Sequence, residues 1–340
     1  MAITQREPQP SPALFFDTVN AYQRSAALKA AIELNIFGAI ASGAGSPAEI
    51  ARECGVAERG ARVLSDYLTT IGFLAKADGR YRLTLDSATF LDPSSPMYMG
   101  SAVRFLNSDE LTSNFTRDLA AAVRKGGTLN GEGVMEPDHP IWVEFARSMA
   151  PLMMLPSQLI AGLVNAAAEE RWKVLDIAAG HGLFGVAIAQ RNPNARIVAV
   201  DWPSVLAVAR ENASAAGVTA RYSTIEGSAF EADLGTAYDL VLLTNFLHHF
   251  DAAANEKLLR KVYAALKPGG RVATLEFVPN ADRVSPPVEA QFSLMMLGAT
   301  ASGDAYTFAE LDRMFRNAGF SRSELHEIPP SIQHVVMSYK

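Results

Sequence analysis

Cysteine is nearly absent from this chain of 340 residues, because Cys54 is its single example. One thiol excludes a disulfide bond within the chain and is typical of proteins in a reducing compartment. The chain also lacks an uncharged apolar run of roughly 18 residues, which a membrane span requires. Residues 1–12 carry no apolar core behind their charges, so they do not resemble a secretory signal. These absences predict a cytoplasmic protein with no membrane partner.

Positive charge is scarce as well. The chain has 30 Lys and Arg against 36 Asp and Glu, which gives a formal net charge of −6. This balance argues against general affinity for nucleic acid, which depends on many cationic contacts to phosphates. Hydrophobic residues make up 49% of the chain, enough for large cores, and the length favours two domains. We expect residues 1–100 to form the first domain and residues 101–340 the second.

The first domain is predicted to be mostly helical. Apolar residues recur at helical spacing between residues 14 and 40. Ser46 and Glu49 then form a pair that is typical of a capped helix start. Gly55 and Gly72 mark the ends of two short helices that follow one another.

Two short strands are expected after these helices, joined by the turn residues Asp78 and Gly79. Two helices and a hairpin in this order are typical of a winged-helix module, and such a module can bind DNA. Acidic Glu58 and Asp66, however, interrupt the cationic residues of the would-be recognition helix. Affinity for phosphates would require a basic stripe. We therefore expect the module to serve packing and dimerisation.

The second domain is predicted to be of the α/β class. From Trp172 onward, strand-like and helix-like segments alternate regularly, which predicts a mostly parallel sheet with helices on both faces. The segment 101–165 before it is expected to be a helical linker, interrupted between residues 126 and 140. The expected strands are 173–178, 196–201, 220–226, 238–244, 271–277 and 333–339, and the expected helices are 182–191, 203–216, 254–266 and 307–318.

Residues 173–182, Lys-Val-Leu-Asp-Ile-Ala-Ala-Gly-His-Gly, predict a strand, a tight turn and the start of a helix. Small residues at such a turn let a ligand approach the main chain, and the helix N-terminus offers free N–H groups. Asp201 ends the next strand, where an acid typically binds ribose hydroxyls. The turn departs from the G-x-G-x-x-G order of a pyrophosphate loop. A domain that binds NAD(P), or no nucleotide, stays an alternative.

The turn resembles the first motif of class I S-adenosylmethionine (SAM) methyltransferases. Nearly the whole chain is similar to the plant-type, small-molecule O-methyltransferase family. Asp201-Trp202-Pro203-Ser204-Val205 resembles the family's D-L-P-x-V, and Gly227-Ser228-Ala229-Phe230 stands where the family has G-D-M-F. The resemblance implies a Rossmann-like sheet after a winged-helix dimerisation domain, a homodimer, SAM as cofactor and S-adenosylhomocysteine as product. The cofactor-binding residues that it implies are Asp176, Ala178, Gly180, Gly182, Asp201, Trp202, Ser228, Ala229 and Phe230.

Leu247-His248-His249-Phe250 stands where the family has L-H-D-W, so His248 aligns with the catalytic base of the family. Glu276 follows at the spacing of the family's Glu that orients this His. A neutral imidazole can accept a phenol proton while the oxygen attacks the methyl group, and a carboxylate can fix its tautomer. The second acid of the family falls near Asp304, but Ala305 takes its register. Either Asp304 substitutes for that acid, or the site works with His248 and Glu276 alone.

The acceptor pocket is expected to be apolar and partly flexible in shape. Phe145 and Met149 resemble the F-x-x-x-M of the family, and Phe and Met side chains suit a flat aromatic acceptor. The role of His249 stays open; two adjacent His residues can indicate a metal, but we find no set of ligands and predict none. The acceptor-binding residues implied are Phe145, Met149, Met153, Asn245, His249, Phe292 and Met296.

Together these motifs predict SAM-dependent O-methylation of a hydroxyl group on an aromatic or polyketide-like small molecule. Two alternatives stay open. Changes from the family pattern at Ser228, His249 and Ala305 keep open a family member that binds SAM but does not methylate, or that methylates carbon with a bound metal. A winged-helix regulator that binds DNA is the other alternative.

Overall fold

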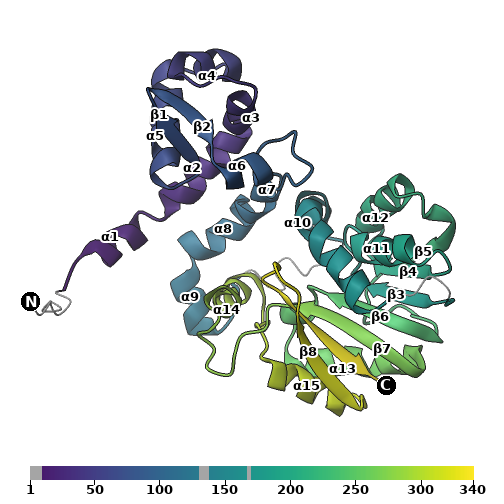
Figure 1. Ribbon diagram of the computed structural model, residues 1–340. Helices are drawn as coiled ribbons and strands as arrows, with labels where there is room; N and C mark the ends of the chain where they lie inside the picture. Colours follow the sequence, from purple (N-terminus) through teal and green to yellow (C-terminus); the bar gives the residue numbers. More distant parts are fainter. Residues whose placement is uncertain (1–9, 130–137, 167–169) are drawn as a thin grey trace, which may run out of the picture. The chain divides into compact units, whose positions relative to one another are not determined.

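The computed structural model describes residues 10–129, 138–166 and 170–340. The chain divides into two compact units, Met1–Asn107 and Ser108–Lys340, which we describe separately (Figure 1). No helix among the described residues is long and apolar enough to cross a membrane.

The first unit is helical apart from one hairpin. Its elements are α1 (Ala13–Val19), α2 (Tyr22–Glu33), α3 (Ile36–Ala41), α4 (Pro47–Cys54), α5 (Glu58–Thr70), β1 (Leu74–Ala77), β2 (Arg80–Leu83), α6 (Leu85–Phe90) and α7 (Ala102–Leu106). Helices α2 to α5 and the hairpin share one apolar core. The winged-helix prediction is confirmed, because two helices precede a two-stranded wing.

Local signals account for the boundaries in this unit. The Ser46 hydroxyl accepts the Glu49 N–H, and the Glu49 carboxylate accepts the Ser46 N–H, so the predicted capping box opens α4. Gly55 ends the helix with a left-handed φ of 66°. Asp78 and Gly79 have φ angles of 52° and 75°, which suits the tight turn between β1 and β2. These predictions from the sequence are confirmed.

The described residues of the second unit form a seven-stranded sheet in the order β5-β4-β3-β6-β7-β9-β8. All neighbours are parallel except β7 with β9 and β8 with β9. The strands are β3 (Lys173–Ile177), β4 (Arg196–Asp201), β5 (Tyr222–Glu226), β6 (Tyr238–Thr244), β7 (Leu266–Glu276), β8 (Arg322–Glu327) and β9 (His334–Tyr339).

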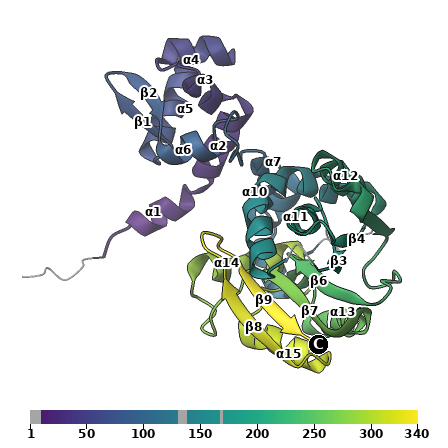
Figure 2. The ribbon, with the colours of Figure 1, turned by 45° about the vertical axis from the view of Figure 1, so that its right-hand side comes forward.

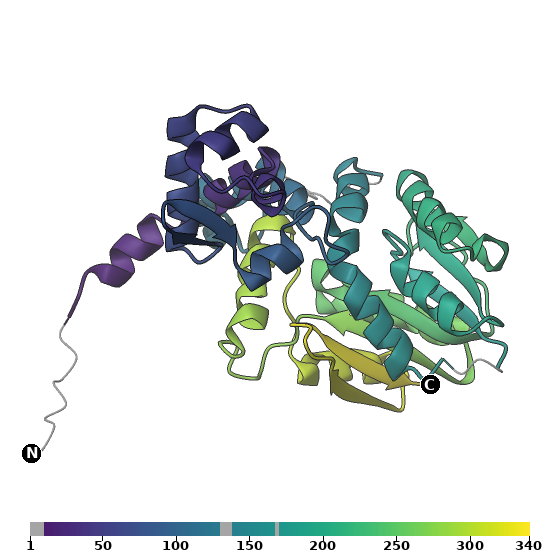
Figure 3. The same cartoon turned by 45° about the horizontal axis from the view of Figure 1, so that its top comes forward.

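Helices cover both faces of this sheet (Figures 2 and 3). The elements are α8 (Asp109–Thr116), α9 (Leu119–Lys125), α10 (Ile141–Leu163), α11 (Leu183–Arg191), α12 (Pro203–Ala215), α13 (Ala252–Ala265), α14 (Pro287–Ala299) and α15 (Phe308–Asn317). Residues of α10, α11 and α12 share an apolar cluster with one face, and residues of α13 and α15 share one with the other. Val174 and Leu175 belong to opposite clusters, because successive side chains of a strand point to opposite faces. The α/β prediction is confirmed.

The fifth predicted strand begins earlier than the sequence indicated. We expected Pro268-Gly269-Gly270 to be a turn before a strand at residue 271, but β7 begins at Leu266. Leu266 already pairs with Tyr238, and the register shifts before Leu240 pairs with Arg271. The Pro-Gly-Gly segment is therefore an irregular part of the strand, because pairing with β6 continues on both sides of it.

Candidate active site

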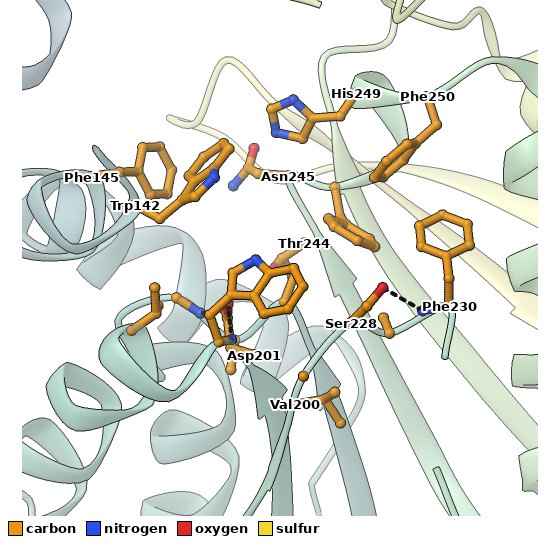
Figure 4. Close-up of a pocket in the computed structure, with 18 of the residues that line it drawn as sticks. Trp142, Phe145, Val200, Asp201, Ser228, Phe230, Thr244, Asn245, His249 and Phe250 are labelled. Atoms are coloured by element: carbon orange, nitrogen blue, oxygen red, sulfur yellow. Dashed lines mark hydrogen bonds between the residues drawn. The ribbon is translucent and has the colours of Figure 1, made fainter. Parts of the chain in front are cut away.

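A cavity of about 450 Å³ opens at the carboxyl ends of β3, β4 and β6. Ligands of open α/β sheets bind at this edge, because the loops after the strands converge there. Figure 4 shows its walls, which come from the glycine turn, the end of β4, the segment after β5, the segment after β6 and α10. The lining residues are Trp142, Phe145, Ala178, Ala179, Gly180, His181, Phe184, Val200, Asp201, Trp202, Val205, Gly227, Ser228, Ala229, Phe230, Glu231, Thr244, Asn245, Phe246, His249, Phe250, Ala301 and Ser302.

The glycine turn between β3 and α11 has a left-handed backbone at alternate positions. Ala178, Gly180 and Gly182 have φ angles of 52°, 57° and 73°. Glycine is required at position 182 for packing as well, because a Cβ there would lie 2.5 Å from the Tyr222 hydroxyl. Ala178 and Gly180 line the cavity, whereas Gly182 packs against the protein. The contact of Gly182 with the cofactor stays a prediction, because Gly182 is not among the residues that line the cavity.

Asp176 also lies outside the cavity wall. Its side chain is buried beneath the turn, and Oδ2 accepts the N–H of Gly185 at 3.0 Å. Burial raises the pKa of this carboxyl to about 8, although the bond from Gly185 opposes the shift. Asp176 holds the start of α11 through this bond, and its predicted role in cofactor binding stays a prediction.

Asp201 ends β4 and faces the cavity (Figure 4). Its Oδ2 accepts the Gly180 N–H at 2.8 Å, and its Oδ1 accepts the Trp202 N–H at 2.8 Å. Burial raises the pKa of this carboxyl to about 6, and the two main-chain bonds limit the shift. Each carboxylate oxygen keeps a second lone pair, which can accept a hydroxyl of a ligand.

The segment after β5 forms another part of the cavity wall. Ser228, Ala229 and Phe230 all line the cavity, and the Ser228 hydroxyl accepts the Phe230 N–H at 3.2 Å (Figure 4). Lys261 of α13 donates hydrogen bonds to the carbonyls of Ala229 and Phe230, both at 3.1 Å, and to that of Ala232. Sequence reasoning missed this lysine, because its three acceptors are main-chain atoms with no sequence signal.

His248 and Glu276 form a buried pair at the end of β6 and β7. His248 Nδ1 lies 2.5 Å from Glu276 Oε2, and both side chains are almost fully buried. Glu276 Oε1 accepts main-chain N–H groups of Phe246, Leu247 and His248 at 3.1, 2.9 and 3.4 Å. When the carboxylate is ionised and the imidazole is neutral, Nδ1 donates to Glu276 and Nε2 keeps a lone pair. This tautomer can act as a base.

Asp304 does not join this pair. Its carboxylate lies 3.1 Å from Arg283 and is partly exposed, and only its main-chain N–H contacts His248, at the carbonyl. Ala305 is fully buried. Of the two alternatives from the sequence, the geometry favours His248 and Glu276 without a second acid.

Aromatic side chains, rather than methionines, form the acceptor end of the cavity. Phe145, Asn245 and His249 lie on the wall, as predicted, but Met149, Met153, Phe292 and Met296 do not. Phe292 contacts the His248 ring, with centroids 4.8 Å apart, and Met153 Sδ accepts a hydrogen bond from Asn245 at 3.5 Å. Phe292 and Met153 therefore pack behind residues of the site, and the acceptor contacts of all four stay predictions.

Several wall residues that sequence reasoning missed lie beside predicted residues on the same strand end or helix. His181 follows Gly180, Thr244 ends β6, Trp142 lies one helical turn before Phe145, and Phe250 follows His249. His181 Nδ1 accepts the Leu183 N–H at 3.1 Å, and burial lowers the pKa of its ring to about 4. The positions at strand ends and in the first turn of α10 could therefore have been used to predict these wall residues.

Among the described residues, no three His, Cys, Asp or Glu side chains are grouped so that they could hold a metal ion. The segments 130–137 and 167–169 lie outside that search.

Comparisons with known proteins identify O-methyltransferase family models in both parts of the chain. Residues 138–321 match the family model of the O-methyltransferase domain, and residues 16–93 match that of the O-methyltransferase dimerisation domain. The chain is 31% identical over 316 residues to 3-hydroxy-5-methyl-1-naphthoate 3-O-methyltransferase of Streptomyces sahachiroi, covering 91% of this chain and 90% of the relative. It is 29% identical over 340 residues to acetylserotonin O-methyltransferase of Mus musculus, covering 95% and 87%.

A solved structure is similar over almost its full length. A crystal structure of a Nostoc punctiforme protein assigned to the O-methyltransferases is 58% identical to this chain, with a TM-score of 0.94. It covers 98% of this chain and 100% of its own.

Proposed function

This chain belongs to the family of SAM-dependent O-methyltransferases, and from that premise we propose that it methylates a hydroxyl group of an aromatic or polyketide-like small molecule. The observation that carries the proposal is the buried pair of His248 and Glu276 beside a cavity with aromatic walls. Relatives named for a naphthoate and for acetylserotonin support an aromatic acceptor.

The cavity residues fit the cofactor of the family. SAM supplies a methyl group on a positively charged sulfur, which leaves S-adenosylhomocysteine after transfer. Asp201 would accept the ribose hydroxyls, because both of its oxygens face the turn and the cavity. Trp202 and Phe230 would flank the adenine with aromatic faces, and the small residues Ala178 and Gly180 leave main-chain groups within reach.

His248 would remove the acceptor proton. With SAM bound as the methyl donor, Nε2 of His248 would accept the proton of the acceptor hydroxyl. Glu276 holds Nδ1–H and stabilises the positive charge that His248 then carries. The cavity walls contribute orientation, because the oxygen must approach in line with the bond that breaks.

The test is transfer from methyl-labelled SAM to a panel of phenols, flavonoids and hydroxylated polyketides, followed by mass spectrometry. We expect a gain of one methyl group on at least one hydroxyl. Tight SAM binding without transfer to any member would contradict the proposal and favour a family member with altered chemistry. A methyl group found on carbon would favour the C-methylating alternative.

Lys261→Met is expected to weaken SAM binding about tenfold and leave kcat at saturating SAM within about twofold. Lys261 is a positioning residue: it holds three carbonyls of the segment that carries Ala229 and Phe230. Calorimetry gives the dissociation constant, and steady-state kinetics separates KM from kcat. Lys257→Met on the same helix is the matched control, and equal effects of the two variants would show that the loss is not specific.

We also propose that the first unit forms a homodimer with a second copy. The match to a dimerisation domain supports this, and so do exposed apolar side chains on α1 and at the start of α2. These side chains are Leu14, Phe15, Phe16, Val19 and Tyr22. Analytical ultracentrifugation would test it, and a monomer at micromolar concentration would contradict it.

We propose no nucleic-acid partner for the winged helix. Arg62 and Lys76 both pair with Asp66, at 3.0 and 2.6 Å, and Arg80 pairs with Glu49 at 2.9 Å. Cations that are already paired offer little free charge to phosphates. The cytoplasmic location stays a prediction from the composition.

A further inference from the structure

His249 is a second imidazole at the acceptor end of the cavity, and the mechanism above does not use it. It stands next to the base, at the position of the Asp in the family's L-H-D-W. Figure 4 shows its ring projecting over Asn245 and Trp142. The ring centroid lies 4.3 Å from that of His248 and 5.4 Å from that of Trp142. His249 therefore lines the cavity directly beside His248, whose own ring lies behind the lining residues.

The imidazole ring of His249 has no hydrogen-bond partner in the part of the chain that the structure describes. Nδ1 is enclosed and has no hydrogen-bond partner among the described residues. Nε2 is not buried as Nδ1 is, and His249 is one of the residues that line the cavity. A polar group in a cavity with aromatic walls costs free energy unless a ligand or water completes its hydrogen bond. Nε2 is therefore the ring atom of His249 that a polar group of the acceptor can reach, whereas Nδ1 is enclosed by the protein.

The surroundings of His249 disfavour a positive charge on its ring. Two imidazoles this close repel each other when both are charged, and Glu276 pairs with His248 alone. Burial, reinforced by His248, lowers the pKa of His249 well below its ordinary value. A neutral imidazole makes one hydrogen bond through Nε2, as donor or acceptor according to its tautomer. His249 can thus bind an oxygen without competing for the proton.

Asn245 is a second polar side chain at this end of the cavity, and both ends of its amide group already make hydrogen bonds. Its Oδ1 accepts a hydrogen bond from Gln333, and its Nδ2 donates to Met153 Sδ at 3.5 Å. The amide is therefore held in place by two neighbours. The ring of His249 has no such partner among the described residues. It is therefore the better candidate for binding a second polar group of the acceptor.

We propose that His249 Nε2 binds a second oxygen of the acceptor, on the ring carbon next to the one that carries the reactive hydroxyl. Side-by-side imidazoles with centroids 4.3 Å apart reach neighbouring substituents of one aromatic ring. A hydroxyl suits either tautomer of His249, because it both donates and accepts. The preferred acceptor is therefore an aromatic ring with two adjacent oxygens. This inference rests on the proposed function, since His248 sets the place of the reactive oxygen.

Three isomers with the same atoms test the inference: catechol, resorcinol and hydroquinone, whose two hydroxyls are adjacent, one carbon apart and opposite. We expect kcat/KM for catechol to exceed that for the other two about tenfold in the wild type. In His249→Phe this ratio is expected to fall to about one. Phe145→Leu, which shortens an apolar wall residue, is the matched control and should lower all three values while keeping the ratio.

Dissociation constants of the isomers, measured by calorimetry with S-adenosylhomocysteine bound, provide a second readout that needs no turnover. Equal values of both kcat/KM and binding for the three isomers in the wild type overturn the inference without any variant. A catechol preference that survives in His249→Phe also overturns it. Absence of transfer to any acceptor of the larger panel contradicts the proposed function instead, and the isomer dissociation constants then still decide whether His249 selects adjacent oxygens.

Discussion

Replacing His248 by Asn is expected to lower kcat for methyl transfer by about 10²- to 10⁴-fold, while the dissociation constant of SAM changes less than about threefold. The Asn side chain can still donate to Glu276, but it has no lone-pair nitrogen where Nε2 was. The variant therefore removes the base and keeps the bond that His248 makes with Glu276. Single-turnover kinetics with a saturating acceptor measures the loss, and calorimetry measures SAM binding.

Two further variants distinguish the loss of the base from the effect of replacing a neighbouring or a remote residue. Glu276→Gln keeps the imidazole but loses the charge that stabilises it, so we expect a fall of about 10²-fold. His326→Asn, on the surface strand β8, should have no effect on kcat, since that residue lies outside the cavity wall. Wild-type turnover in His248→Asn would remove His248 as the base.

Replacing Asp201 by Ala is expected to weaken SAM binding about 100-fold. The variant removes the acceptor of the ribose hydroxyls and leaves the N–H groups of Gly180 and Trp202 unpaired in the cavity wall. Calorimetry measures the dissociation constant. Glu226→Ala is the matched control: Glu226 lies beside Asp201 on β5, but its carboxylate pairs with Arg210 outside the cavity. An unchanged dissociation constant in Asp201→Ala would contradict the ribose assignment.

The same carboxylate predicts a pH dependence of cofactor binding. Burial raises the pKa of Asp201 to about 6, so the free protein takes up a proton there as the pH falls below that value. The neutral form accepts ribose hydroxyls less well, and the dissociation constant of adenosine is expected to rise up to about tenfold per pH unit below pH 6. Adenosine is the chosen ligand because it lacks the amino-acid groups of SAM. A flat profile between pH 7 and 5 would argue against this role.

Low pH is expected to weaken ligand binding at Asp201 but to favour the folded state through the same carboxyl. Because the pKa of this carboxyl is higher in the folded than in the unfolded chain, the folded state binds the proton more tightly. Its contribution to the free energy of unfolding therefore grows as the pH falls from about 6 towards the pKa of this carboxyl in the unfolded chain. The contribution is lost as the pH rises through about 6. Thermal unfolding of the wild type and of Asp201→Asn across this range would show the difference.

The elements and their order were predictable because their signals are local. The capping box of Ser46 and Glu49, the turn at Asp78 and Gly79, and the alternation of apolar strands and helices each depend on neighbouring residues. Strand β7 was placed wrongly at its start. Its continuation from Leu266 depends on pairing with Tyr238, a residue far away along the chain.

The sequence by itself determined the sheet and the winged helix, and its resemblance to the family implied the pairing of His248 with Glu276. Only the tertiary structure decided which side chains reach the cavity. Asp176 and Gly182 belong to the right motif but pack beneath the turn, whereas Lys261 fixes the cavity wall from a helix without any motif. The physical reason is that a motif fixes the path of the main chain. The exposure of each side chain depends on what packs against it from distant parts of the chain.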